Sequence, residues 1–245
     1  MTRGVAAFVA LLLVCGACAD SADDDTVLVL AAASLTDAFA EIEVAFEGAN
    51  PGIDVQLNLA GSTALREQIF QGAPADVFAS ANAATMQAVV NAGDANEPQL
   101  FASNTLVLAV PIDNPAGVTG PGDLADPDRL VGLCAAAVPC GDFARQALDQ
   151  LGIEAVPDTN ELDVRALLTK IEAGELDVGM VYATDVAASD LVRGIALPPR
   201  AEVEIVYPIA TLPDGSNPSQ ATAFVDFVLS ATGQQILADF GFGAP

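Results

Sequence analysis

Small, uncharged residues stand at four places where a predicted strand runs into a predicted helix. These places are Ala33-Ser34-Leu35, Gly61-Ser62-Thr63, Val138-Pro139-Cys140-Gly141 and the helix start at Asp163-Val164. The first turn of a helix leaves backbone N–H groups without intrahelical acceptors and carries a partial positive charge, so it can hold a small anion without Lys or Arg. The hydroxyls of Ser34 and Ser62 would add two donors. Taken singly, each serine is more typical of a helix N-cap, and the anion-binding interpretation requires all four starts to face one cleft.

The composition of the chain excludes most other chemistry. Its 245 residues include no His, no Trp and two Tyr, and 33 acidic residues stand against 8 basic ones, for a formal charge of -25. Without His, the commonest general base and the commonest transition-metal ligand are missing, which also disfavours an iron receptor. The acidic surface disfavours nucleic acid and anionic lipid as partners. A hydrolase would need two carboxylates that converge in a cleft, and none of the four helix starts carries such a pair.

Hydrophobic periodicity indicates which elements hold these helix starts. A nearly continuous apolar run at 26–33 is typical of a strand buried on both faces, and helical spacing of apolar residues follows it. Further strands are predicted at 53–60, 76–80, 104–111, 130–135, 178–182 and 203–210, and further helices at 62–71, 83–92, 142–151, 162–173, 219–229 and 233–240. Strands and helices that alternate through short loops predict an α/β protein with mostly parallel sheets.

The same pattern divides the chain into two lobes. A chain of this length can form two units of about 100 residues each. We expect residues 26–103 and 206–245 to form lobe 1 and residues 104–205 to form lobe 2, each a mostly parallel sheet flanked by helices. Two such lobes, joined by crossing strands, leave a ligand cleft at the ends of their strands.

The N-terminus has the layout of a secretory signal. Arg3 precedes an apolar run at 5–15, which is too short to span a bilayer of about 30 Å. Two small residues then lead directly into Cys18, and this segment resembles a bacterial lipoprotein signal, in which the Cys after the cut is lipid-modified. We therefore predict a signal peptide with its acceptor Cys18 at residues 1–18 and an acidic tether at 19–25. An ordinary secreted protein with a spare Cys is the alternative.

Cys134 and Cys140 are a candidate disulfide pair. In an oxidising compartment, an even pair of cysteines this close in sequence is compatible with a bridge, although spacing alone does not bring the two Cα atoms to bridging distance. Redox-active pairs more often have the C-x-x-C spacing, which five intervening residues do not match. A structural bridge is therefore favoured over redox chemistry.

Several segments, taken in order, resemble those of one protein family. They are Ala31-Ala32-Ala33-Ser34-Leu35, Ser62 with Gln68-Ile69, GAPADVFAS at 72–80, Val138-Pro139-Cys140-Gly141, Asp163-Val164-Arg165, Gly179-Met180-Val181-Tyr182 and Phe240-Gly241-Phe242. In this order the segments resemble the periplasmic molybdate-binding proteins of ABC transporters, over about residues 27–242. The resemblance implies a two-lobed type II periplasmic-binding-protein fold with a tetrahedral oxyanion buried between the lobes.

The resemblance also implies five ligand-binding residues. Ser34 and Ser62 match serines that donate both N–H and O–H, Cys140 and Val164 match residues that donate a backbone N–H, and Tyr182 matches a tyrosine whose hydroxyl closes the site. The implied ligand is molybdate, with tungstate as a second ligand, and the metal would be bound only as that oxyanion. No cofactor and no enzymatic activity are implied. The alternatives are another tetrahedral oxyanion such as sulfate, a carboxylate-based surface hydrolase, and a surface lipoprotein that acts only as an interaction module.

The partners and the location follow from the same resemblance. The protein would be an extracytoplasmic monomer, lipid-anchored to the cell membrane or periplasmic, that delivers its oxyanion to the permease and ATPase subunits of an ABC transporter. It would touch the membrane through the lipid anchor alone and would bind no nucleic acid. Two charged residues near the motifs are expected to be structural: Asp76 would brace a loop, because a carboxylate repels an anion, and Arg165 would pair with a neighbouring acid.

Overall fold

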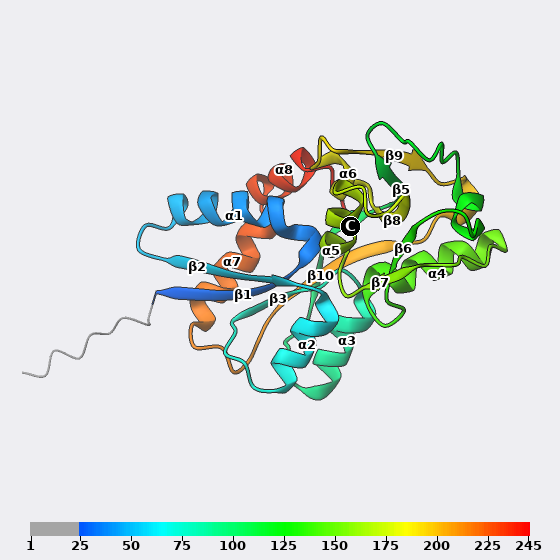
Figure 1. Ribbon diagram of the computed structural model, residues 1–245. Helices are drawn as coiled ribbons and strands as arrows, with labels where there is room; N and C mark the ends of the chain where they lie inside the picture. The colour runs from blue at the N-terminus through cyan, green and yellow to red at the C-terminus, as the bar shows by residue number, and fades with distance from the viewer. Residues whose placement is uncertain (1–24) are drawn as a thin grey trace, which may run out of the picture.

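The computed structural model describes residues 25–245, which form two five-stranded sheets with helices on their faces (Figure 1). The predicted signal peptide, Cys18 and all but the last residue of the tether lie outside the described residues. In the first sheet the strand order is β2 (Asp54–Ala60), β1 (Thr26–Ala32), β3 (Val77–Ala79), β10 (Ile205–Thr211) and β4 (Gln99–Asn104). In the second sheet it is β7 (Thr159–Glu161), β6 (Val131–Cys134), β8 (Val178–Tyr182), β5 (Leu106–Pro111) and β9 (Val192–Ala196).

Helices cover both faces of the first sheet, and this sheet with its helices is called the first lobe below. The helices are α1 (Thr36–Ala49), α2 (Ser62–Phe70), α3 (Ala83–Ala92), α7 (Pro218–Leu229) and α8 (Ala231–Asp239). On one face α1, α7 and α8 pack together, and Phe224 lies edge-on to both Phe39 and Phe46 of α1. On the other face Leu65 of α2 and Met86 of α3 pack in a separate apolar cluster. β1 is therefore buried on both sides, as its apolar run predicts.

The second sheet carries α4 (Pro139–Leu151), α5 (Val164–Glu172) and the short α6 (Ala183–Ala187), and together they form the second lobe. Glycine in two adjacent strands lets α5 approach the sheet closely. A Cβ on Gly132 would lie 2.5 Å from Leu167 Cδ1, and one on Gly179 would lie 2.8 Å from Ile171 Cδ1. Both distances are shorter than van der Waals contact, so larger residues would push α5 outward and move its N-terminus with it.

Two stretches of chain connect the lobes, and they lie side by side. β4 ends at Asn104 and β5 begins at Leu106, so one residue separates the two sheets at the first crossing. The chain returns before β10, and Ile205 at the start of that strand is paired with Asn104. The junction of the lobes is therefore a narrow pair of antiparallel strands.

The two-sheet α/β architecture agrees with the prediction, but the sheets are more mixed than expected. Each sheet has two parallel and two antiparallel strand pairs. The three strands without a sequence signal, β4, β7 and β9, all lie at sheet edges, where fewer side chains need to be apolar. Along residues 25–245, every helix is too short or too polar to cross a membrane.

Candidate anion-binding site

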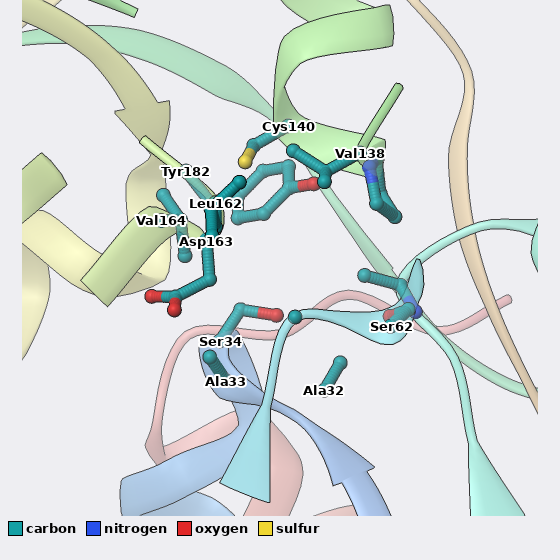
Figure 2. A pocket seen from close by; sticks show the side chains of 13 residues that line it. Ala32, Ala33, Ser34, Ser62, Val138, Cys140, Leu162, Asp163, Val164 and Tyr182 are labelled. Atoms are coloured by element: carbon teal, nitrogen blue, oxygen red, sulfur yellow. The ribbon is translucent and has the colours of Figure 1, made fainter. Parts of the chain in front are cut away.

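A small cavity lies between the lobes, at the ends of β1 and β8 and the beginnings of three helices. It measures about 20 Å³, far below the roughly 300–1,000 Å³ typical of small-molecule sites. All five residues singled out from the sequence line this cavity: Ser34, Ser62, Cys140, Val164 and Tyr182. Figure 2 shows the Ser34 hydroxyl and the Tyr182 phenol directed into the space between the two lobes. The cavity is therefore of a size for a small ion.

Ser34 does not cap a helix, contrary to the more common role of serine at such a junction. It lies inside a short 3-10 turn, Ala33–Leu35, that precedes α1, and no side chain caps that turn or α1. The Ser34 Oγ instead lies 3.1 Å from the hydroxyl of Tyr207 on β10. Both side chains are buried, so this contact fixes the position of the Ser34 hydroxyl at the cavity wall.

Ser62 is the first residue of α2, and Gly61 occupies the N-cap position. The Ser62 Oγ accepts a hydrogen bond of 3.0 Å from the backbone N–H of Ala81, so its own hydrogen is free to be donated into the cavity. Gly61 lies against the second lobe. A Cβ at this position would come within 2.5 Å of the carbonyl oxygen of Leu162, so glycine permits the lobes to meet here.

Cys140 lies in the first turn of α4, which starts at Pro139 rather than at residue 142 as predicted. Its sulfur is bonded to that of Cys134 at the end of β6, with the two Cα atoms 5.7 Å apart. The bridge closes the loop that carries the first turn of α4. Space within this loop is tight, because a Cβ on Gly141 would lie 1.9 Å from the carbonyl oxygen of Ala135.

Val164 begins α5, two residues after the predicted helix start at 162, and Asp163 is the helix cap. The Asp163 carboxylate accepts a hydrogen bond of 2.8 Å from the N–H of Ala166. Asp163 borders the cavity, but its carboxylate points away from the Ser34 hydroxyl (Figure 2). The carboxylate is therefore engaged in capping, and α5 presents its backbone rather than an acid to the cavity.

The backbone N–H groups at these helix starts are available to a ligand. Within residues 25–245, no acceptor is found for the N–H of Ser62, Cys140 or Val164, as expected for the first turn of a helix. The three helices α2, α4 and α5 come from both lobes, and their partial positive ends converge on one cavity. The cavity therefore gathers donors and positive potential although no Lys or Arg is among its described lining residues.

Tyr182, at the end of β8, carries a buried hydroxyl with no hydrogen-bond partner in the structure. An unpaired buried hydroxyl is unfavourable and uncommon, so this atom is available to a ligand in the cavity. Burial raises the pKa of Tyr182 well above its usual value, so the phenol keeps its proton and can donate it. Behind it, Asp185 accepts a hydrogen bond from the Tyr182 N–H at 3.1 Å, and burial raises the pKa of Asp185 to about 7.

Two polar contacts join the lobes beside the cavity. Arg165 Nη1 on α5 lies 3.0 Å from Asp37 Oδ2 on α1, which agrees with the expected pairing of Arg165 with an acid. Thr63 Oγ1 on α2 donates to the carbonyl oxygen of Ala137 at 2.9 Å. The lobes are therefore in contact around the cavity, in a closed arrangement.

The arrangement can hold an anion but offers nothing for hydrolysis or metal ligation. Among the described residues that line the cavity, Asp163 is the one carboxylate, so the acid pair of a glycosidase-like site is missing. No group of His, Cys, Asp or Glu in residues 25–245 is arranged to hold a metal ion. Asp76 is a brace, as expected, because its carboxylate accepts the N–H groups of Leu28 and Asn217.

Sequence reasoning missed the residues behind the cavity. Tyr207 lies in an apolar strand and Asn104 at the end of an edge strand, where nothing in the local pattern marks a polar role. Asp185 follows Tyr182 at helix-start spacing, and this is the one signal that could have placed it beside the site.

Comparisons with known proteins agree with the fold. A model of the bacterial extracellular solute-binding protein family matches residues 27–243. The molybdate-binding protein ModA of Mycobacterium tuberculosis is 40% identical over 222 residues, which cover 90% of this chain and 85% of that protein. YvgL of Bacillus subtilis, described as an ABC transporter substrate-binding lipoprotein, is 32% identical over 252 residues, 98% of this chain and 96% of that protein. The periplasmic molybdate-binding protein of Azotobacter vinelandii has the same fold, with a TM-score of 0.78 at 22% identity over 89% of this chain and 99% of that chain.

Proposed function

The chain belongs to the family of bacterial extracellular solute-binding proteins, and we propose that it captures molybdate for an ABC transporter. The family consists of binding proteins, so the protein acts without chemical conversion of its ligand. The 40% identity to a molybdate-binding protein over 90% of the chain supports this ligand. Tungstate, which has nearly the same size and charge, is the second ligand of the proposal.

One observation carries the proposal: donors from both lobes, and no cation, converge on one small cavity. A tetrahedral dianion in that cavity would accept hydrogen bonds from the hydroxyls of Ser34, Ser62 and Tyr182 and from the backbone N–H groups of Cys140 and Val164. Because two of these residues lie in the first lobe and three in the second, the ligand would stabilise the closed arrangement over the open one.

The same donors would select among anions. Molybdate, tungstate and sulfate carry no proton near neutral pH, so every ligand oxygen can accept a hydrogen bond. Hydrogen phosphate carries one proton and needs an acceptor, whereas the five proposed ligand-binding groups act as donors and none of them is a carboxylate. Discrimination between molybdate and the smaller sulfate would then depend on the size of the cavity, because both anions have the same charge.

The proposed partners are the permease and ATPase subunits of the transporter. The lipoprotein description of YvgL supports attachment of the mature chain to the membrane through a lipid on Cys18, with tether residues 19–25 between the anchor and the folded lobes. Loss of membrane association in a Cys18→Ala variant of the full chain, with normal secretion, is the expected result of this part of the proposal. Retention at the membrane would contradict it.

Calorimetric titration tests the proposed ligand. The chain from Ala19 onward would be titrated with molybdate, tungstate, sulfate and phosphate at neutral pH. Saturable binding of the first two, with weaker or no binding of sulfate and none of phosphate, is the expected result. Binding of sulfate in preference to molybdate would support the proposed site but would identify sulfate as its ligand. Absence of binding to all four anions would contradict the proposal.

A further inference from the structure

The Ser34 hydroxyl is the end of a hydrogen-bonded chain that runs behind the cavity into the junction of the lobes. Ser34 Oγ lies 3.1 Å from the hydroxyl of Tyr207, and that hydroxyl lies 3.4 Å from Nδ2 of Asn104. The Asn104 amide also donates to Thr184 Oγ1 at 2.8 Å. The members of this chain are buried, and Tyr207 and Asn104 belong to β10 and β4, the two strands that meet where the lobes are joined.

The direction of each hydrogen bond in this chain is determined by its neighbours. The Asn104 Oδ1 accepts the N–H of Thr105 at 2.9 Å, and this contact orients the amide so that its nitrogen faces Tyr207 and Thr184. An amide nitrogen can only donate, so the Tyr207 oxygen accepts from it. Burial raises the pKa of Tyr207, which keeps the phenol protonated, and Ser34 Oγ is the acceptor that lies within hydrogen-bond distance of this hydroxyl among the described contacts, so we assign Tyr207 as the donor to Ser34.

Ser34 is left with one role toward the cavity. Its oxygen already accepts the Tyr207 hydrogen, so its own hydrogen is available to be donated to a ligand (Figure 2). The Ser62 hydroxyl is oriented in the same way by a single backbone donor, the N–H of Ala81. The two serines therefore present hydrogens to the same cavity from two elements of the first lobe. The Ser62 hydroxyl is oriented by the main chain, and the Ser34 hydroxyl is oriented by the Tyr207 hydroxyl and the Asn104 amide, which are called the Asn104–Tyr207 relay.

We propose that Tyr207 is a positioning residue which, with Asn104, makes the Ser34 hydroxyl a donor toward the bound oxyanion. This inference rests on the proposed function, since it assumes an oxyanion in the cavity. Tyr207 does not line the cavity and acts through Ser34. Because the Tyr207 hydrogen occupies one lone pair of Ser34 Oγ and the Ser34 hydrogen is directed at the ligand, Ser34 is a poorer acceptor for an anion that carries a proton, and the relay contributes to the rejection of such anions.

A double-mutant cycle tests the relay. Tyr207→Phe removes the hydroxyl and keeps the ring, which packs edge-on against Phe101 and Phe242. We expect this variant to bind molybdate about 5- to 10-fold more weakly than the wild-type chain, the effect of one hydrogen bond. In a Ser34→Ala background the same substitution is expected to change affinity by less than about twofold, because the group through which it acts is gone.

Ser62→Ala is the matched control background. Ser62 lines the same cavity and has its own donor, so Tyr207→Phe should keep its full 5- to 10-fold effect there. A second measurement tests the orientation of the hydrogens. In Tyr207→Phe the Ser34 hydroxyl can turn and accept a hydrogen bond from the phosphate proton, so the ratio of molybdate affinity to phosphate affinity should fall. An equal loss of affinity for both anions would contradict the donor role of Ser34.

The outcomes separate the relay from the proposed function. If Tyr207→Phe bound molybdate as tightly as the wild-type chain, or if the substitution weakened binding equally with and without Ser34, the relay would be wrong. Molybdate binding by the wild-type chain would still support the proposed function in that case. Urea unfolding of each variant shows whether a loss of affinity is caused by a loss of the fold. Absence of oxyanion binding in the wild-type chain would overturn both.

Discussion

The Tyr182 hydroxyl allows a prediction in which stability and ligand affinity respond differently. Tyr182→Phe removes one oxygen and leaves the ring, whose centroid lies 6.2 Å from that of Tyr207. In the closed arrangement the Tyr182 hydroxyl is buried and has no partner among the described protein groups, a situation that costs about 1–3 kcal/mol when no ligand is bound. If water reaches the hydroxyl when the lobes open, that cost disappears. The free energy of unfolding without ligand should therefore be unchanged or rise by up to about 3 kcal/mol.

Affinity for the oxyanion should change in the opposite sense. A hydrogen bond to a charged group contributes about 1.5–3 kcal/mol, so loss of the Tyr182 donor is expected to weaken molybdate binding by about tenfold to a hundredfold. Calorimetric titration gives the affinity, and urea unfolding without molybdate gives the stability. Tyr207→Phe is the matched control for stability, because its hydroxyl is already hydrogen-bonded and its loss should lower the free energy of unfolding by about 1 kcal/mol.

The result that would refute this reasoning is specific. If Tyr182→Phe destabilised the ligand-free protein by more than 1 kcal/mol and bound molybdate as tightly as the wild-type chain, the hydroxyl would have a structural partner and no ligand. The cavity would then lack its donor from β8.

Three further predictions concern groups around the cavity. Replacement of both Cys134 and Cys140 by Ser should lower the free energy of unfolding by about 2 kcal/mol, which is the loop-closure value for so short a ring. The same replacement should weaken molybdate binding. Equal molybdate affinity in the reduced and the oxidised protein would contradict a role of the bridge in holding the first turn of α4. Burial raises the pKa of Asp185 from its ordinary value of 3.8 to about 7, so its contribution to stability is complete below about pH 4 and is lost as the pH rises through 7. Asp185→Asn should therefore gain about 2.5 kcal/mol of unfolding free energy relative to wild type between pH 5 and pH 8 in urea titrations, and a pH-independent difference would show that the carboxyl titrates normally. Asp37→Asn removes the partly exposed ion pair with Arg165 and should weaken molybdate binding by less than about fivefold. The difference in affinity from the wild-type chain should shrink in high salt. A loss of affinity that does not depend on salt would mean that Asp37 has a role other than charge pairing.

Much of the fold could be predicted because buried segments leave strong patterns. The apolar runs of β1, β5 and β8 and the helical spacing of α1 depend on burial, which acts on every residue in the segment. β4, β7 and β9 lie at sheet edges and leave no such pattern, and the antiparallel pairing of β4 with β10 and of β9 with β5 could therefore not be predicted. The mixed character of the sheets follows from these edge strands and from β5 and β10, which were predicted as strands but run antiparallel to β8 and β3.

The cavity lining could be predicted because small residues at helix starts are local features. Ser34, Ser62, Cys140 and Val164 lie in the four helix starts that the sequence marks, and the resemblance to molybdate-binding proteins singles them out within those segments. The contacts behind the cavity are of another kind, since Ser34 and Tyr207 are separated by 173 positions in the chain. Their meeting depends on β10 returning to lie beside β3 in the first sheet, and no local pattern contains that information.

A crystal structure of the chain from Ala19 onward, grown with molybdate and measured on both sides of the molybdenum absorption edge, tests the central claim most directly. The account predicts one strong anomalous peak in the cavity between the lobes, with ligand oxygens within about 3 Å of the Ser34, Ser62 and Tyr182 hydroxyls and of the backbone nitrogens of Cys140 and Val164. An empty cavity in a crystal that holds molybdate elsewhere on the protein would contradict it.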